Sequence, residues 1–425
     1  MQTFAINTLG CKVNQYESQQ IIQFLTDCNL LYVQNLQSAE IIIIHTCCVT
    51  KTASAKSRHL VHKAQKLNPI AKIIVSGCLI NSDTNEFENL KGNILFTPNI
   101  QGLFALLKSE LNLNPKPVEN NILHKFCGQT RAFLKVQDGC DGFCSYCIIP
   151  TTRPNITSKP IDDIINESQD LVNAGHKEII LTGIFLGAYG QNTVKRKKWP
   201  DNENPLLAEM LEKVAQVPNL KRIRLSSLEP ADVTPRLLDV IKNYRNIMPH
   251  MHLSLQSGSD KILKKMNRQY TIKDFNNSIE NIKSQLDRPA ITTDIIVGFP
   301  GETTQDFSQS LSIAKLAGFS KIHIFPFSKR TGTAAAKLQD HINKEIITER
   351  TKILHELEKE LANNFRKQFV GQTAQVLIEN EVKNTGKCER YYEITIKTNN
   401  TLPQGEIVTC TINNDAVTAS IVNSL

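Results

Sequence analysis

Three cysteines in one short loop carry the most evident chemistry in this chain. Cys140, Cys144 and Cys147 follow the spacing C-x3-C-x2-C, and no fourth cysteine stands nearby. Structural zinc sites and ferredoxin clusters normally have four protein ligands, and zinc sites are usually built from paired C-x2-4-C halves. Three thiolates in one loop instead predict a [4Fe–4S] cluster with one iron open to another molecule. The alternative interpretation is three unrelated cysteines that pack as small apolar side chains.

A second set of three cysteines is spread over the N-terminal part of the chain. Cys11, Cys47 and Cys78 each follow a segment that we predict to be a β-strand. If these strands form one parallel sheet, their carboxyl ends lie along the same edge, where ligands bind in such sheets. The three thiolates would then converge without a local motif. Two alternatives stay open: buried cysteines that pack as small apolar side chains, or a zinc site to which the adjacent Cys48 adds a fourth thiolate.

The sequence from residue 1 to residue 115 alternates predicted strands with predicted helices. The strands are expected at Thr3–Leu9, Ile41–Ile44 and Lys72–Val75, and the helices at Gln15–Leu25 and Lys51–Leu67. Asn14 and Glu17 have the spacing of a capping box at the start of the first helix. This alternation predicts a doubly wound α/β domain. Aperiodic sequence with prolines predicts a linker around residues 112–121.

Six strand-then-helix units are expected in the central segment, residues 126–366. The strands are predicted at Ala132–Val136, Glu178–Thr182, Arg222–Ser226, His252–Leu255, Ile291–Val297 and Lys321–Phe325, and a long helix at Lys344–Phe369. Six units are too few to close an eight-fold βα barrel, so we expect an open, partial barrel with its active groups in the loops after the strands. Residues 367–425 hold short strands rich in Val, Ile and Thr between turn signals, which predicts a small all-β barrel.

Composition limits the classes of protein that remain. The chain has 425 residues and a net charge of +8, which is compatible with several domains and a polyanionic partner. Eleven cysteines are too few for a disulfide scaffold in so long a chain, and their clustering favours metal binding in a reducing cytosol. No apolar run approaches the ~20 residues of a membrane span, and the N-terminus lacks the form of a secretory signal. We therefore expect a cytoplasmic protein outside the membrane.

The segments around these cysteines are similar to those of a known family. C-x3-C-x2-C with an aromatic residue before the last cysteine, here Tyr146, resembles the cluster loop of radical S-adenosylmethionine enzymes. The flanks TLGCKVNQYES, HTCCVT and SGCL resemble the three cluster-binding boxes of the methylthiotransferases. The resemblance continues through GHKEIILTGIFLGAYG, RIRLSSLEP, HLSLQSGS, DIIVGFPGE and IFPFSKRTGT, and the C-terminal stretch resembles a TRAM domain. It thus covers nearly the whole chain.

This resemblance implies two [4Fe–4S] clusters, one held by the loop cysteines and one by Cys11, Cys47 and Cys78, each with an open iron. S-adenosylmethionine is expected both as the radical source at the loop cluster and as the methyl donor. The further cofactor contacts expected from position or resemblance are Tyr146, Glu229, Gln256, Gly298, Gly301 and Glu302. Tyr146 and the glycine-rich segment would lie near the adenine. Glu229 and Gln256 could hydrogen-bond the ribose or carboxylate, but purely structural roles in the barrel mouth stay open for both.

The box LGCKVNQYES is most similar to the subgroup that acts on N6-threonylcarbamoyladenosine beside the anticodon of tRNA. It implies methylthiolation of C2 of that nucleoside at position 37, with tRNA as partner, an external one-electron reductant and no stable protein partner. Subgroups that act on N6-isopentenyladenosine or on a ribosomal-protein aspartate are the alternatives within the family. Outside the family, an iron–sulfur electron carrier or an RNA-binding protein without sulfur transfer stays open.

Several basic residues are candidates for contact with nucleic acid. The run Lys195–Lys198 with Trp199 combines charge with an aromatic side chain, although a solvated loop is the alternative. Arg268 and Arg330 are candidate phosphate or substrate contacts, and a surface or ion-pair role is the alternative for each. The sequence departs from the family pattern at His45, at Thr151–Asn155, where only Arg153 keeps its expected place, and at Cys388 and Arg390.

Overall fold

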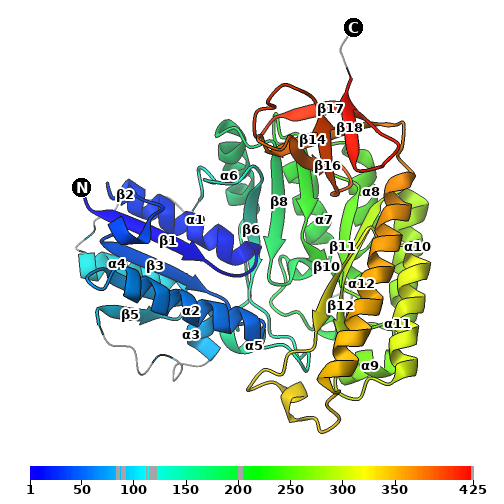
Figure 1. Ribbon diagram of the computed structural model, residues 1–425, viewed down its shortest axis with the longest axis horizontal. Helices are drawn as coiled ribbons and strands as arrows, with labels where there is room; N and C mark the ends of the chain where they lie inside the picture. Colours follow the sequence, from blue (N-terminus) through cyan, green and yellow to red (C-terminus); the bar gives the residue numbers. More distant parts are fainter. Residues whose placement is uncertain (83–86, 88–91, 112, 114–121, 200–203, 423–425) are drawn as a thin grey trace.

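The computed structural model describes residues 1–82, 87, 92–111, 113, 122–199 and 204–422. It contains, in chain order, an N-terminal parallel sheet, a central open barrel and a small closed C-terminal barrel (Figure 1). The predicted fold class is therefore confirmed. The expected domain boundary at residue 115 lies outside the described residues. Within the described part of the chain, none of the helices combines the length and apolar character needed to cross a membrane.

Five parallel strands form the N-terminal sheet, in the order β2-β1-β3-β4-β5. The elements are β1 (Thr3–Thr8), α1 (Lys12–Asp27), β2 (Leu31–Tyr32), β3 (Ile41–Thr46), α2 (Lys51–Leu67), β4 (Lys72–Gly77), α3 (Cys78–Ser82), β5 (Ile94–Thr97) and α4 (Ile100–Leu111). On β3, Ile41 and Ile43 pack with α1 and α4, whereas Ile42 and Ile44 pack on the side of α2. Because helices cover both faces, the strand is apolar at all four positions.

The central barrel consists of six βα units, as predicted. Its strands are β6 (Ala132–Asp138), β8 (Glu178–Gly183), β9 (Arg222–Leu225), β10 (Ser227–Leu228), β11 (His250–Leu253), β12 (Ala290–Val297) and β13 (Lys321–Pro326), of which β9 and β10 belong to one unit. These strands run parallel, in the orders β6-β8-β9 and β10-β11-β12-β13, and a parallel bridge between Ile223 and Ile247 joins the two sheets. A short strand, β7 (Thr157–Ser158), pairs antiparallel with β6. The described strands leave the barrel open between β7 and β13.

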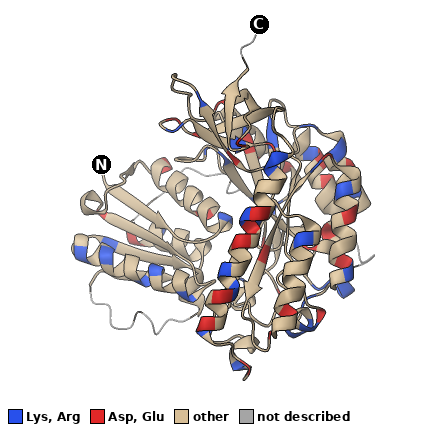
Figure 2. Cartoon of the chain, turned by 45° about the vertical axis from the view of Figure 1, so that its right-hand side comes forward, with Lys and Arg blue, Asp and Glu red and all other residues tan. Residues whose placement is uncertain are grey.

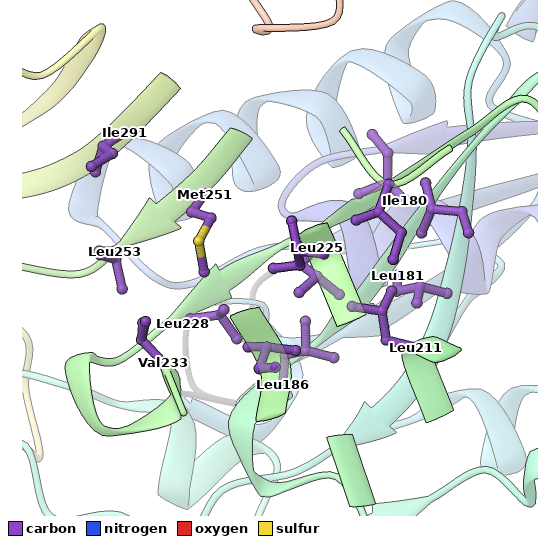
Figure 3. Close-up of a cluster of buried hydrophobic side chains, with 14 of the residues drawn as sticks. Ile180, Leu181, Leu186, Leu211, Leu225, Leu228, Val233, Met251, Leu253 and Ile291 are labelled. Carbon is purple, nitrogen blue, oxygen red and sulfur yellow. The ribbon is translucent and has the colours of Figure 1, made fainter. Parts of the chain in front are cut away.

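Helices cover the outer side of the barrel and bury its main core. They are α6 (Ile161–Asn173), α7 (Pro205–Ala215), α8 (Pro235–Asn243), α10 (Ile272–Gln285), α11 (Thr304–Ala317) and α12 (Lys344–Lys367). Two short helices, α5 (Ile149–Thr152) and α9 (Asp260–Lys265), lie in the segments that follow β6 and β11. Figure 3 shows part of this core, in which Ile180, Leu225 and Met251 of three strands belong to one cluster with Leu211 of α7. This apolar packing fixes the strand ends from which the functional loops emerge.

The C-terminal barrel docks on the amino ends of the central strands. Its strands are β14 (Thr373–Asn380), β15 (Thr385–Cys388), β16 (Glu393–Lys397), β17 (Ile407–Ile412) and β18 (Thr418–Ile421), closed in the order β14-β15-β16-β18-β17. Arg222 donates hydrogen bonds to the backbone carbonyls of Gln375 and Lys387, and Arg224 donates to those of Cys388 and Glu389. The loops after the strands are thus left free at the opposite end of the barrel (Figure 1).

Two local features differ from the sequence-based expectation. Helix α1 begins at Lys12, and Asn14 does not cap it: its side chain donates instead to the backbone carbonyls of Leu9 and Thr46, which ties the helix to two strand ends. The short strands β2, β5, β15 and β18 were not predicted. Their pairing in the sheets defines them, because each contains only two to four residues.

Candidate active site

The loop cysteines lie where the predicted barrel mouth should be. Cys140, Cys144 and Cys147 follow β6 and line one cavity of about 160 Å³. Backbone hydrogen bonds hold the loop: the N–H of Cys140 donates to the carbonyl of Arg153, and the N–H of Ser145 donates to that of Met266. The loop is therefore fixed to two distant segments of the chain, and its three thiols open into a common space.

A buried chain of charges forms one wall of this cavity. Arg268 places Nη1 3.2 Å from Cys144 Sγ and 3.4 Å from the Tyr146 hydroxyl, and its Nη2 lies 2.5 Å from Glu229 Oε1. Arg196 holds the other oxygen of Glu229 at 3.2 Å. Arg268 is thus a buried neighbour of the loop cysteines. The sequence predicted a phosphate or substrate contact for this residue and did not indicate its contact with Cys144.

The chemistry of the loop thiols fits a metal cluster. Burial raises the pKa of Cys140 to about 11 and that of Cys147 to about 12. Such thiols ionise at neutral pH only beside a strong cation, and coordination to a metal removes the proton. Cys140 Sγ also accepts a hydrogen bond from the N–H of Gly142, and hydrogen bonds to sulfur tune the potential of iron–sulfur clusters. The residues present therefore fit a cluster with three thiolate ligands.

The second trio is assembled by the N-terminal sheet. Cys11 follows β1, Cys47 follows β3 and Cys78 follows β4, and these three strands are direct neighbours. The order of the strands reverses between β1 and β3, which is where ligands bind in sheets of this kind. Gly10 has φ +121°, and a Cβ there would lie 3.0 Å from the Cβ of Cys47. Only glycine lets these two cysteine segments approach so closely.

Arg153 connects the second trio to the barrel. Its Nε lies 3.4 Å from Cys78 Sγ, and its guanidinium donates to Glu17 on α1 at 2.6 Å and to Asp138 on β6 at 3.0 Å. Lys135 on β6 also reaches Glu17 at 2.8 Å. A cavity of about 540 Å³ borders this network. The network joins the sheet that carries the second trio to the strand from which the first trio follows.

Cys48 lies beside the second trio as well. Hydrogen bonding from the Cys48 thiol and the positive charge of Arg153 lower the pKa of Cys78 to about 6, against the opposing effect of burial. Burial raises the pKa of Cys47 to about 11. The trio therefore combines two buried cysteines, Cys47 and Cys78, with the exposed Cys11 and a fixed cation beside Cys78, and it fits a cluster. The neighbouring Cys48 keeps the four-thiolate zinc alternative open on geometry alone.

The two trios lie near one another, although the loop cysteines and Cys78 line separate cavities. Ile148, which follows Cys147 directly, packs in one apolar cluster with Cys48, Cys78 and Leu79. On the far side of the barrel mouth, the backbone N–H of Lys51 donates to Ser328 in the loop after β13. The carboxyl edges of the sheet and of the barrel are thus turned toward each other.

The other residues expected to contact a cofactor separate into two groups. Tyr146 and Glu229 line the cavity of the loop cysteines, whereas Gln256, Gly298, Gly301 and Glu302 are not among its lining residues. Glu302 is buried against Arg350 of α12 and accepts the N–H of Gly298. Gln256 has a left-handed backbone, with φ +62°. The cofactor roles of all six residues, and the ligand roles of the six cysteines, stay predictions.

The basic run after residue 194 contributes to the barrel more than to a surface. Arg196 and Trp199 are buried, the guanidinium lies 4.8 Å from the Trp199 ring, and Arg196 also pairs with Asp232. Lys197 and Lys198 are exposed. A different basic surface lies on α2, which carries five Lys or Arg residues and no acidic residue; Figure 2 shows this charge along the helix. The excess of Lys and Arg over Asp and Glu in residues 51–67 is visible in the sequence, but it was not among the predicted nucleic-acid contacts.

Two family models match the chain. The Radical SAM superfamily matches residues 134–314, which include the loop cysteines, and the Uncharacterized protein family UPF0004 matches residues 3–97, which include the second trio. A structural relative shares the fold: radical S-adenosylmethionine methyltransferase TsrM from Kitasatospora setae has a TM-score of 0.54 at 12% identity, covering 76% of this chain and 72% of that chain.

Relatives at higher identity span nearly the whole chain. Threonylcarbamoyladenosine tRNA methylthiotransferase MtaB of Chlamydia pneumoniae is 40% identical over 380 residues, covering 89% of this chain and 87% of the relative. tRNA-2-methylthio-N(6)-dimethylallyladenosine synthase of Thermodesulfovibrio yellowstonii is 33% identical over 418 residues, covering 95% and 94%. Both alignments also cover well over two thirds of the relative's own length.

Proposed function

The chain belongs to the radical S-adenosylmethionine methylthiotransferase family, and from this we propose that it methylthiolates C2 of N6-threonylcarbamoyladenosine at position 37 of tRNA. The observation that carries the proposal is the pair of cysteine trios at neighbouring edges, one in the barrel mouth and one at the carboxyl edge of the sheet, joined by the packing of Ile148 against Cys78. Relatives named for this nucleoside are 33–40% identical to the chain, and relatives named for dimethylallyladenosine are 32–33% identical.

Members of this family contain two [4Fe–4S] clusters and use S-adenosylmethionine. We infer that Cys140, Cys144 and Cys147 hold one cluster and that the second trio holds the other. When bound, the loop cluster supplies the electron that cleaves S-adenosylmethionine to a radical, and the second cluster supplies the sulfur for transfer. Cys48 remains a structural neighbour in this assignment.

Residues of the cavity position the cofactor in this proposal. Arg268 sets a fixed positive charge between Cys144 and Glu229. Glu229, held from the other side by Arg196, presents a carboxylate that can accept hydrogen bonds from ribose hydroxyls or an amino group. Apolar side chains, including Phe185, Val194 and Leu228, complete the lining and limit the access of water.

The tRNA would bind across the edge that contains both trios. Helix α2 begins four residues after Cys47 and exposes Lys56, Lys63 and Lys66 without a compensating acid on the same helix. Such a basic helix provides phosphate contacts that position RNA without reading its sequence. We place the reaction in the cytoplasm with an external one-electron reductant.

Nucleoside analysis of tRNA tests this function directly. The full chain is reconstituted with iron and sulfide without oxygen and incubated with S-adenosylmethionine, a chemical reductant and tRNA that contains both N6-threonylcarbamoyladenosine and N6-dimethylallyladenosine. Mass spectrometry of the digested tRNA should show the methylthio derivative of the first nucleoside. A product formed only from the second nucleoside would transfer the chain to the other subgroup, and no methylthio product would contradict the function.

A further inference from the structure

The inner face of the barrel carries a group of polar side chains that neither cysteine trio uses. His252 on β11, Asp294 on β12 and His323 on β13 come from three neighbouring strands. The register pairs Asp294 with His323 and places His252 beside Thr292. The nearest ring nitrogens and carboxylate oxygen of the three residues all lie within 4.8 Å of one another. We name His252, Asp294 and His323 the histidine face.

Its orientation follows from the alternation of β12. Ile291 and Ile295 pack in the main core beneath the outer helices, so Thr292 and Asp294 point to the inside of the barrel. Along the same inner row, Ala290 packs with the C-terminal barrel, and Ile296 belongs to the apolar cluster that Tyr146 joins. The histidine face therefore lies between the docked C-terminal barrel and the cavity of the loop cysteines.

The face has hydrogen-bonding capacity that the protein leaves unused. His252 is oriented by Thr292, whose Oγ1 lies 2.9 Å from Nδ1. Its Nε2 is 3.3 Å from Asp294 Oδ2 but makes no well-formed hydrogen bond, although only 12% of the side chain is exposed. Asp294 is partly exposed, and His323 is exposed on the edge strand. Buried polar atoms without partners are unfavourable, so the face is suited to a polar ligand.

A positive charge completes the surroundings. Lys12, directly after Cys11, is close enough for its charge to act on both His323 and His250. It makes no ion pair within the part of the chain that the structure describes. Partial burial, with the charges of His252, Lys321 and Lys12, lowers the pKa of His323 against the opposite effect of Asp294. The imidazole can donate a hydrogen bond from at least one of its ring nitrogens.

Resting on the proposed function, we propose that the histidine face and Lys12 bind the threonylcarbamoyl group of the nucleoside. This group has a carboxylate, a hydroxyl, a carbonyl and amide N–H donors. Lys12 and His323 offer donors to its carboxylate, while Asp294 offers an acceptor to its hydroxyl or N–H. A dimethylallyl group has no polar atoms and would leave these protein groups without partners. A site of this kind rejects an apolar analogue strongly.

The test measures binding of three anticodon stem-loop RNAs that differ only at position 37. They carry N6-threonylcarbamoyladenosine, N6-dimethylallyladenosine or adenosine, and fluorescence anisotropy reports their affinities for the reconstituted full chain. The wild type should prefer the threonylcarbamoyl RNA over the adenosine RNA by about 10-fold or more, the effect of one or two charge-assisted hydrogen bonds. His323→Phe and Asp294→Asn should remove most of that preference. His355→Phe, at an exposed position on α12, is the matched control and should keep it.

The possible outcomes distinguish a failure of the threonylcarbamoyl-binding proposal from a failure of the proposed function. If nucleoside analysis finds the expected product but both variants keep the wild-type preference, the histidine face does not bind the threonylcarbamoyl group and the proposed function stands. If the wild type prefers the dimethylallyl RNA and modifies only that nucleoside, both hypotheses fail. Metal analysis distinguishes a third case: loss of one divalent ion per chain in His323→Phe would make the face a metal site and overturn the substrate assignment.

Discussion

The two cysteine trios differ in how much of the fold each one requires. The loop trio lies within one segment after β6, so the local path of that loop brings its cysteines together, although Arg153 and Met266 hold the loop in place. The second trio exists only when β1, β3 and β4 lie side by side and when Gly10 allows the close approach of Cys47. Its sulfur also depends on Arg153, which comes from the other part of the chain. Radical generation should therefore survive perturbations that abolish sulfur transfer.

Removing each trio in turn should have the largest effect and tests the difference between the two trios directly. The triple variant Cys11→Ala, Cys47→Ala and Cys78→Ala should lose methylthio transfer but still cleave S-adenosylmethionine, because the loop trio is intact. The corresponding loop variant should lose both activities. The iron content should fall from about eight irons per chain to about four in either variant.

These measurements also test the metal assignment. A reconstituted wild type that holds only about four irons, or zinc at the second trio, would contradict the two-cluster arrangement. If the sheet variant stopped cleaving S-adenosylmethionine while its circular dichroism stayed unchanged, the division of roles between the trios would be wrong.

Arg153→Ala should have the next largest effect, since it leaves the buried Glu17 with Lys135 as its main cation. We expect a loss of about 3 kcal/mol in the free energy of unfolding, the lower end of the range for breaking a buried pair. Iron should be lost from the second trio before the loop trio. Chemical denaturation and iron analysis measure the two effects.

Arg153→Lys provides the control for charge. Lysine keeps the positive charge but cannot donate to Glu17 and Asp138 together through a planar guanidinium. An intermediate loss of stability would support a role for the paired geometry. If the alanine variant were as stable as the wild type and kept all of its iron, Arg153 would not connect the two parts.

Neutralising the basic helix should change RNA binding without changing either trio. Lys56→Ala, Lys63→Ala and Lys66→Ala together should weaken tRNA binding several-fold. The slope of log affinity against log salt should fall by up to about 0.7 for each lysine that contacts a phosphate of single-stranded RNA. The lysines of α12, at positions 344, 352 and 359, are the matched control because acidic residues lie among them. An unchanged salt slope would exclude α2 from the interface.

Cys48→Ser should have the smallest effect and sharpens the definition of the second trio. Cys48 is buried in an apolar cluster beside Cys78, so a modest loss of stability is expected. Iron content and methylthio transfer should stay close to the wild type. A loss of iron equal to that of Cys47→Ser would make Cys48 a ligand.

The sequence predicts what is local or periodic, and less of what depends on distant partners. The loop trio follows from spacing, and the strand-end trio follows from the rule that parallel strands present their carboxyl ends together. The contact of Arg268 with Cys144 could not be predicted, because 124 positions separate them. Asn14 was misjudged for a related reason: local spacing indicated a cap, but two nearby carbonyls at strand ends compete for its side chain.

The same reasoning explains the limits for the cofactor contacts. Glu229 lies in the cavity as its position after a strand indicates, whereas Glu302 is engaged by Arg350, which lies 48 positions away. Gly298 has φ +78°, and a Cβ there would approach Ile347 to 2.4 Å, so packing against α12 alone requires glycine. The residue types of the glycine-rich motif are thus also required by packing against α12, a requirement that the sequence alone does not reveal.

The docking of the C-terminal barrel has a consequence for sequence variation. Arg222 and Arg224 bind carbonyl oxygens of the barrel backbone, which every amino acid possesses. The departure from the family pattern at Cys388 therefore leaves the Arg224 contact unchanged, because Arg224 donates to the backbone carbonyl of that residue and not to its side chain. The exposed side chains of the C-terminal barrel can therefore change through evolution while its backbone contacts with the central barrel stay the same.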